Sequence, residues 1–462
     1  MALLVGMVRG PSIYNPLKHP ERARERRNQI LQILLETGQI NPAQRKWLAH
    51  EPLGVVDRLP AVNPYPAYLD LVKKQLPSAY SAADLERKGL NIFTAFNPSR
   101  QHQLELGLAN GLKRFADSSV QPAAIVADYL SGDVVAMVSD RQPTFPGFNR
   151  AISAQRPIGS LIKPLLLYGL VESGQTLASL VDDRPIRIRQ SDGAVWSPRN
   201  FDRKLHGRTT LYNAFINSYN LPFVRLGVDQ GGLEPLVANL QRIHLLKQST
   251  VYPSLLLGST AMTAFEVAQM YQVIANAGYF AALTTIREVV DTRGEVLTRI
   301  PLESRELFKR NSMLQVIRGL IGVTTDGTAR YLQQRFAGTT YAGKTGTTND
   351  LRDSWFAGFG NRHLSVVWLG KDDNQPVGLT GSAGALRVWA DIMAQIGEAS
   401  LQLAPAPALE WHYIDRLDGG LSKQGCENSV LLPFARGSAP TERAACRGNY
   451  LQRGLEWLQE EF

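Results

Sequence analysis

Three short segments of the sequence carry residue types that together can perform acyl transfer. The first is Ser160-Leu-Ile-Lys163, followed directly by Pro164. Proline lacks a backbone N–H and fits a helix only in its first turn, so this segment predicts a helix that begins close to Ser160. Residues three apart lie on one helical face, and the hydroxyl of Ser160 is therefore expected beside the amine of Lys163.

A serine hydroxyl is a weak nucleophile unless a base takes its proton. Lysine can serve as that base only if its pKa is lowered. The apolar neighbours of Lys163, among them Leu161 and Leu165, would bury the amine and lower its pKa, and a second cation nearby would add to this effect. Taken alone, the segment favours a simpler interpretation, in which the serine caps a helix and the lysine reaches solvent.

The second segment is Ser218-Tyr-Asn220, followed by Leu221 and Pro222. In a turn or an extended loop, positions i and i+2 face the same way, so a hydroxyl and an amide could enter one cleft together. Because a residue before proline avoids the helical conformation, a loop is predicted here. Alone, this segment would be an ordinary polar turn between two helices.

The third segment is Lys344-Thr345-Gly346-Thr347, at the start of a strand-like run. A glycine in a strand lets an extended peptide lie close to the backbone. The lysine and the threonine hydroxyls can hold a carboxylate. The backbone N–H of Thr347 could pair with that of Ser160 to form an oxyanion hole.

The same residues suggest a rival class of protein. GTTYAGKT, at residues 338–345, fits the phosphate-binding loop pattern GxxxxGK[ST] of ATPases. Such a loop follows a strand and opens a helix. Here a helix-like ARYLQQRF precedes it and a strand and turn follow, so the match is interpreted as accidental. The sequence also contains no HExxH and no GxSxG, which argues against metalloproteases and against hydrolases with a nucleophile elbow.

Size and composition limit the possibilities. The 462 residues are 44% hydrophobic, which is enough for two or three units, and the formal net charge of +9 suits an anionic partner such as a lipid headgroup, a nucleic acid or an acidic polymer. Arginines at residues 22–27 would form either a solvated helix face or a phosphate contact.

No run of about 18 apolar residues occurs, so no membrane span is expected. Cys426 and Cys446 would form a disulfide, worth about 3 kcal/mol, or stay as two buried thiols.

Patterning along the chain predicts the fold. The sequence predicts helices over residues 20–50, with Asn41 as an N-cap, and an extended linker over the proline-rich residues 51–68. A hairpin is predicted around Ser131-Gly132-Asp133, helices dominate residues 160–335, and residues 340–371 read as a three-stranded meander. Hairpin and meander together predict one antiparallel sheet with helices packed on it, an α/β fold of the α+β type.

In their order and separation, the three motifs resemble the signature set of penicillin-recognising serine acyl transferases. Residues 149–164, 343–350 and 370–376 and the late cysteine pair resemble bifunctional, class A penicillin-binding proteins of the 1B type. Residues 6–31 resemble the last part of the glycosyltransferase domain of those proteins. The resemblance implies a transpeptidase fold like that of serine β-lactamases, with a sheet sandwiched by helices. It divides the chain into a glycosyltransferase remnant (1–50), a linker region (51–95), a transpeptidase domain (96–400) and a C-terminal extension (401–462).

The resemblance also implies a D,D-transpeptidase that crosslinks peptidoglycan. Ser160 would attack the penultimate D-Ala of a stem peptide, with Lys163 as base and Ser218 as proton relay. Asn220 would hold the donor amide. The terminal carboxylate would bind to Lys344, Thr345 and Thr347. Lys344 is also counted among the catalytic residues, and Gly346 among those that bind the substrate. β-Lactams would acylate the same serine, and no cofactor or metal is needed.

Location and partners follow from the same resemblance. The enzyme would work on the periplasmic face of the bacterial inner membrane and would bind stem peptides, β-lactams, cell-wall synthesis proteins and lipoprotein activators, but no nucleic acid. The resemblance places a membrane anchor and a small activator-binding domain upstream, so this chain is expected to lack both.

Some features depart from the family pattern. The sequence has no EDxxFxxH-like motif, so no glycan polymerisation is expected. A serine β-lactamase would share the three motifs but needs a group that activates water, and no ExxLN-like segment lies between the second motif and the third. A non-catalytic penicillin sensor or scaffold remains a further alternative.

Overall fold

The computed structural model describes residues 1–55, 63–77, 80, 89–189, 193–229, 231–246, 252–403 and 405–446. The chain forms two compact units, Met1–Asn63 and Pro64–Phe462. No helix in the described ranges is long and apolar enough to cross a lipid bilayer.

The first unit is helical. Its helices are α1 (Ala2–Met7), α2 (Pro20–Glu36) and α3 (Pro42–His50). Asn41 caps α3 by accepting from the backbone of Gln44, whose side chain accepts in return from the backbone of Asn41, so the predicted helix start is confirmed. Arg27 of the basic cluster is buried and donates to the carbonyls of Ala49 and Glu51 at the end of α3. This arginine therefore joins two helices and is not free for a phosphate.

A five-stranded sheet forms the centre of the second unit. Its strands are β2 (Gln121–Asp128), β3 (Asp133–Val138), β14 (Ala342–Thr347), β15 (Ser354–Phe359) and β16 (His363–Gly370). They are ordered β14-β15-β16-β2-β3, with antiparallel neighbours throughout. The predicted hairpin, the predicted meander and their union in a single sheet are all confirmed.

Helices cover both faces of this sheet. Every residue of β15 and β16 is buried, which requires cover on both sides. Helix α12 (Ala264–Ala275) packs on one face, and α6 (Pro98–Leu112) and α15 (Ala385–Ile396) pack together on the other. The predicted sheet sandwiched by helices is therefore confirmed.

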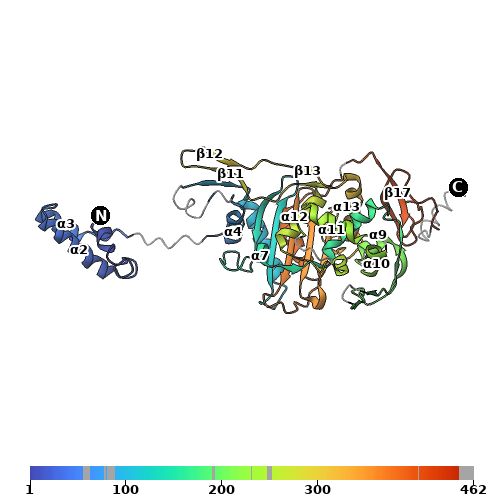
Figure 1. Cartoon of the computed structure of the whole chain (residues 1–462), viewed down its shortest axis with the longest axis horizontal. Coiled ribbons are helices and arrows are strands. Elements are labelled where there is room, and N and C mark those ends of the chain that lie inside the picture. The colour runs from blue at the N-terminus through green and yellow to red at the C-terminus, as the bar shows by residue number, and fades with distance from the viewer. Residues whose placement is uncertain are drawn as a thin grey trace, which may run out of the picture. The chain divides into compact units, whose positions relative to one another are not determined.

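The other elements surround this core. Its further helices are α4 (Pro66–Gln75), α7 (Arg150–Ser153), α8 (Lys163–Glu172), α9 (Leu211–Ile216), α10 (Leu221–Asp229), α11 (Leu233–Arg242), α13 (Arg310–Thr325) and α14 (Tyr331–Arg335), with short 3₁₀ helices η1 (Gly159–Ile162), η2 (Pro253–Leu257) and η3 (Asn349–Leu351). The strands of the small sheets are β1 (Asn91–Thr94), β4 (Arg156–Pro157), β5 (Leu180–Asp183), β6 (Ile188–Arg189), β7 (Val195–Trp196), β8 (Gly207–Thr210), β9 (Ala261–Met262), β10 (Tyr279–Phe280), β11 (Ile286–Val290), β12 (Val296–Arg299), β13 (Arg305–Glu306), β17 (Leu409–Asp415) and β18 (Ser429–Ala435). Within the second unit, β11 and β12 lie at the end near α4, and β17 lies at the opposite end (Figure 1).

Two predictions need correction. The extended linker predicted for residues 51–68 is wrong at its end, because α4 begins at Pro66 and buries Tyr68 and Leu71 in the core of the second unit. Residues 56–62 of that prediction lie outside the described residues. The helical interpretation of residues 160–335 is incomplete, since short strands β5–β13 lie between the helices. These two-residue to five-residue strands are too short to give a period-2 pattern.

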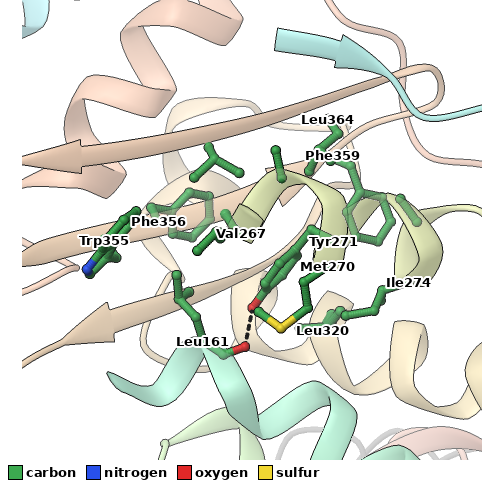
Figure 2. Close-up of a cluster of buried hydrophobic side chains, with 14 of the residues drawn as sticks. Leu161, Val267, Met270, Tyr271, Ile274, Leu320, Trp355, Phe356, Phe359 and Leu364 are labelled. Atoms are coloured by element: carbon green, nitrogen blue, oxygen red, sulfur yellow. Dashed lines mark hydrogen bonds between the residues drawn. The ribbon is translucent and has the colours of Figure 1, made fainter. Parts of the chain in front are cut away.

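Helix α12 connects the sheet to the turn that carries Ser160. Its side chains Val267, Met270 and Ile274 pack among buried residues of the sheet (Figure 2). The hydroxyl of Tyr271, fully buried, donates to the carbonyl of Leu161 in η1 at 3.1 Å. One hydrogen bond thus ties the turn to a helix that lies in the core of the unit.

The C-terminal residues form a separate hairpin, β17–β18, on the side of α13, where Arg318 donates to the carbonyl of Leu431. Cys426 and Cys446 are joined by a disulfide. This bridge ties the segment after β18 back to the loop before it.

Replacing Tyr271 with Phe should lower the free energy of unfolding by about 1 kcal/mol, because it removes one buried hydrogen bond. It should also speed amide hydrogen exchange in residues 159–163. Tyr68→Phe is the matched control, since Tyr68 is equally buried and donates to the carbonyl of Val134, away from η1. The control should lose similar stability without faster exchange at residues 159–163. Equal exchange in both variants would contradict the anchoring role.

Candidate active site

The first motif lies where two kinds of helix meet. Residues Gly159–Ile162 form the 3₁₀ turn η1, and α8 begins at Lys163 with Pro164 in its first turn. The predicted helix start close to Ser160 is confirmed. Ser160 is partly exposed, whereas Lys163 is fully buried. The hydroxyl therefore reaches solvent and the amine does not.

Two glycines bring the first motif against the third. Gly159 has φ +55°, and a Cβ there would lie 2.6 Å from the carbonyl oxygen of Thr347. A Cβ on Gly346 would lie 2.7 Å from the carbonyl oxygen of Ile158. Only glycine tolerates such contact between backbones. The turn that carries Ser160 thus lies directly against strand β14.

The second motif lies in the connection between α9 and α10. Ser218 has φ +60°, a conformation that few residues other than glycine adopt. Helix α10 begins at Leu221 with Pro222, so the predicted loop is confirmed. Strained backbone of this kind persists only where surrounding contacts enforce it, and it is concentrated at functional sites.

The three motifs meet at the hydroxyl of Ser218. Lys344 donates to this hydroxyl at 2.8 Å, and Lys163 approaches the same oxygen at 3.4 Å. Lys163 also donates to the carbonyls of Ser218 and Tyr219 and to Oδ1 of Asn220, at 2.8, 2.9 and 2.8 Å. Residues 163, 218 and 344, distant in sequence, are therefore in direct contact.

Burial strongly affects both amines. Burial lowers the pKa of Lys344 to about 7. Burial, and after it the positive charge of Lys344, lowers the pKa of Lys163 well below that of an exposed lysine. The three oxygen acceptors of Lys163 act in the opposite direction, because they stabilise the ammonium form. Desolvation is the larger influence for an amine with no exposed surface, so we assign Lys163 a lowered pKa.

Within the described residues, the amine of Lys163 has no hydrogen bond to the hydroxyl of Ser160. All of its bonds go to the Ser218–Asn220 loop. A neutral amine has two N–H groups and a lone pair, so it cannot keep all three carbonyl-type acceptors. Loss of a proton would free Lys163 to turn its lone pair toward Ser160.

A cavity of about 990 Å³ opens over this cluster. The motif residues that line it are Ser160, Ser218, Asn220, Thr345 and Thr347. Lys163, Lys344 and Gly346 lie behind its wall and are buried. The Thr347 hydroxyl accepts from the backbone of Gly381 at 2.9 Å, and Thr345 shares a hydrogen bond with Thr328 at 2.8 Å. The lining of the cavity thus includes the hydroxyl-bearing residues of all three motifs and Asn220.

The phosphate-loop interpretation fails on geometry. Lys344 and Thr345 lie inside strand β14, and the next helical element is the three-residue η3, which begins at Asn349. The amine of Lys344 is buried against the hydroxyl of Ser218 and is not presented to a ligand by a helix that follows β14. The interpretation of the GxxxxGK[ST] match as accidental is confirmed.

One supporting cluster was not predicted from the sequence. Buried Asn200 accepts from the backbone N–H of Asn220 and of Leu221, at 2.7 and 3.2 Å. Its own amide donates to both oxygens of Asp183, which also accepts from His206 at 2.6 Å. The ring of His206 stacks on that of Tyr219, with 3.8 Å between centroids. This network fixes the backbone of the second motif, but no spacing in the sequence marks its members.

Comparison with known proteins agrees with this geometry. The family described as "Penicillin binding protein transpeptidase domain" matches residues 123–393, more than half of the chain. The chain belongs to this family. All three motifs lie inside the matched range.

Curated relatives point to one type within the family. The chain is 38% identical to penicillin-binding protein 1B of Vibrio cholerae over 470 aligned positions that cover 100% of this chain and 60% of that protein. It is 36% identical to penicillin-binding protein 1B of Escherichia coli, covering 87% of this chain and 49% of that protein. The chain therefore spans about half to three fifths of the length of these relatives.

Solved structures share the fold. The chain aligns with penicillin-binding protein 1A from Haemophilus influenzae with a TM-score of 0.82 at 20% identity, covering 96% of this chain and 86% of the other. It aligns with PonA1 from Mycobacterium tuberculosis, solved in complex with penicillin V, with a TM-score of 0.65 at 20% identity, covering 74% and 96%. At this identity the likeness establishes the transpeptidase fold alone.

Replacing Asn200 with Ala should lower the free energy of unfolding by about 2 kcal/mol, because two backbone N–H groups lose their acceptor. Exchange of the Asn220 and Leu221 amides should become faster. Gln101→Ala is the matched control, since buried Gln101 accepts from the backbone of Met137 on the far side of the sheet. Slow exchange at Asn220 in the Asn200 variant would show that the network does not hold the loop.

Proposed function

We propose that this chain is the D,D-transpeptidase part of a class A penicillin-binding protein of the 1B type. It crosslinks peptidoglycan stem peptides through an acyl-enzyme on Ser160, and β-lactams acylate the same residue. The observation that carries the proposal is the contact of Lys163 and Lys344 with the hydroxyl of Ser218 beneath a cavity lined by Ser160. This arrangement supplies a nucleophile, a lowered-pKa base and a proton relay in one place.

In the acylation step, the oxygen of Ser160 attacks the carbonyl carbon of the penultimate D-Ala, and neutral Lys163 takes the serine proton. The tetrahedral oxyanion is held by the N–H groups of Ser160 and Thr347. The close approach of Gly159 to Thr347 supports this pairing. The C–N bond then breaks, and Ser218 passes a proton to the departing amine.

Substrate placement follows from the cavity walls. The terminal carboxylate binds to the hydroxyls of Thr345 and Thr347, with the charge of Lys344 behind the wall. Gly346 makes room for the turn that carries Ser160, because a Cβ there would meet Ile158 and Leu161. Asn220 holds the donor amide. A hydroxyl that accepts from Gly381, as in Thr347, still has its proton to donate to a carboxylate.

In the second step, an amine of a neighbouring stem peptide attacks the ester carbonyl of the acyl-enzyme. The new C–N bond forms, the C–O bond to Ser160 breaks, and the amine proton returns to the serine oxygen. A β-lactam follows only the first step, because its departing nitrogen stays attached to the acyl group. The acyl-enzyme then has no vacant place for an acceptor.

We further propose that the chain works on the periplasmic face of the inner membrane. The disulfide between Cys426 and Cys446 supports an oxidising compartment. Cell-wall synthesis proteins and lipoprotein activators are proposed partners of the whole protein.

A fluorescent penicillin should label the purified chain covalently, and Ser160→Ala should abolish the labelling because the variant lacks the nucleophile. Label that persists for hours would support a transpeptidase. Rapid release of the label would favour the β-lactamase alternative, and no label dependent on Ser160 would favour the scaffold alternative. Ser259→Ala is the matched control, since Ser259 also lines the cavity and lies outside the motifs.

The rate of acylation should fall as the pH is lowered, because protonation of the buried lysine pair removes the base. We expect the decline well below the pH at which an exposed lysine titrates, because burial lowers the pKa of Lys163. Lys344 gains its own proton at about pH 7. Lys344→Met removes the positive charge that lowers the pKa of Lys163, so the decline should move to higher pH. Stopped-flow acylation between about pH 5 and about pH 10, a range that includes the ordinary pKa of histidine and approaches that of lysine, measures both profiles. An unshifted profile in the variant would contradict the coupling of the two amines.

A further inference from the structure

A second cavity adjoins the proposed active site. It has a volume of about 400 Å³. Thr328 and Ser382 line both this cavity and the larger one over Ser160. The polar residues that line the smaller cavity are Thr328, Arg330, Tyr331, Gln334, Ser382 and Arg387. A group held there would lie next to the motif residues without entering their cavity.

The chemistry of this second cavity is that of an anion site. Its wall carries the guanidinium groups of Arg330 and Arg387 and the amide of Gln334, and no aspartate or glutamate is among its lining residues. The guanidinium carbon of Arg387 lies over the ring of Tyr331, 3.4 Å from its centroid. Stacking on an aromatic ring holds a guanidinium in place and leaves its N–H edge available for two parallel bonds to a carboxylate.

Both of these arginines lack an acidic partner in the part of the chain that the structure describes. No ion pair or side-chain hydrogen bond involves the guanidinium of Arg330 or Arg387 there. Nearby Arg335, on the same helix α14 as Tyr331, differs because it pairs with Asp391 at 3.9 Å. The two cavity arginines therefore present unused positive charge beside the site.

The position of the cavity indicates which substrate it serves. Thr328 bonds to Thr345 of the third motif, so the cavity begins beside the place proposed for the terminal carboxylate of the donor. The departing D-Ala leaves on that side of the acyl carbon. An amine that reverses this step must approach from the same side. A group extending from the reacting amine past Thr328 therefore belongs to the acceptor.

We propose that the cavity around Arg330 and Arg387 binds a carboxylate of the acceptor peptide during the second step. This inference rests on the proposed transpeptidase function and adds to it the recognition of the acceptor. The reaction is the one given above, in which the amine nitrogen forms a bond to the acyl carbon and the Ser160 oxygen leaves with the proton. The two arginines take no part in the bond changes and hold the acceptor so that its amine faces the ester.

The test uses two matched acceptors. One is a short peptide with a reactive side-chain amine and free carboxylates, and the other is the same peptide with its carboxylates converted to carboxamides. The donor is an N-acylated D-Ala-D-Ala peptide. The measured quantity is kcat/KM for the acceptor, obtained from the ratio of transfer product to hydrolysis product.

The double variant Arg330→Ala with Arg387→Ala should lower kcat/KM for the carboxylate acceptor roughly tenfold or more, because it removes charge-assisted hydrogen bonds. The loss for the carboxamide acceptor should be less than about twofold, since an amide forms no ion pair. Arg335→Ala, on the same helix but outside the cavity, should leave the ratio between the two acceptors unchanged. The single variant Arg387→Lys should keep only part of the unmutated kcat/KM for the carboxylate acceptor, because lysine keeps the charge but not the paired N–H edge.

Penicillin labelling of Ser160 in each variant shows whether the site is assembled. If the double variant fails to fold, the single lysine substitutions at positions 330 and 387 carry the same comparison between acceptors. Equal loss for both acceptors, or no loss, in variants that label normally would overturn this inference and leave the proposed function intact. Absence of label in the unmutated chain would overturn the proposed function and this inference with it.

Discussion

The site depends on two lysine amines buried within reach of one serine hydroxyl. Lys163 and Lys344 have no exposed surface, and both approach Ser218. Two ammonium groups so close and so far from water repel each other and lose hydration, so at least one is forced toward the neutral form near neutral pH. Under the proposed function, the neutral amine is the base for Ser160. The strained Ser218 loop and the glycine contacts between η1 and β14 hold the surroundings of the pair in place.

Separate elements of the fold fix the positions of Lys163, Lys344 and Ser218. Strand β14 fixes Lys344 at the edge of the sheet, α8 fixes Lys163, and the Ser218 loop with its positive φ places the serine hydroxyl in contact with both. Tyr271 holds the turn before Lys163 to the central helix. Because these elements come from separate stretches of the chain, the site forms only when they are folded against one another. Local unfolding of any one of them would separate the amines and restore their ordinary pKa.

Sequence patterns predicted the parts that depend on local rules. Pro164 marks a helix start because it lacks an N–H group, and Asn41 marks one because its side chain accepts from an N–H group of the first turn. The apolar patterns of β2 and β16 predicted strands of a hairpin and a meander. The motifs, because their types and order are specific, predicted which residues would share a site. What could not be predicted was long-range support. Asn200 and Asp183 reach the second motif only through the folded chain, and nothing in their spacing reveals it. Pro66 was assigned to a linker because a proline-rich run hides the helix that begins there.

The most direct test of the buried pair is a titration of both amines by NMR, with lysines labelled at the ε-carbon and Lys163→Met and Lys344→Met used for assignment. We expect Lys344 to titrate near pH 7 and Lys163 to titrate well below an exposed lysine. If both resonances titrate together with those of the surface lysines, at about pH 10, the lowered pKa values of the buried pair would be contradicted. The pair would then be charged throughout the physiological range, and the base for Ser160 would have to be another group.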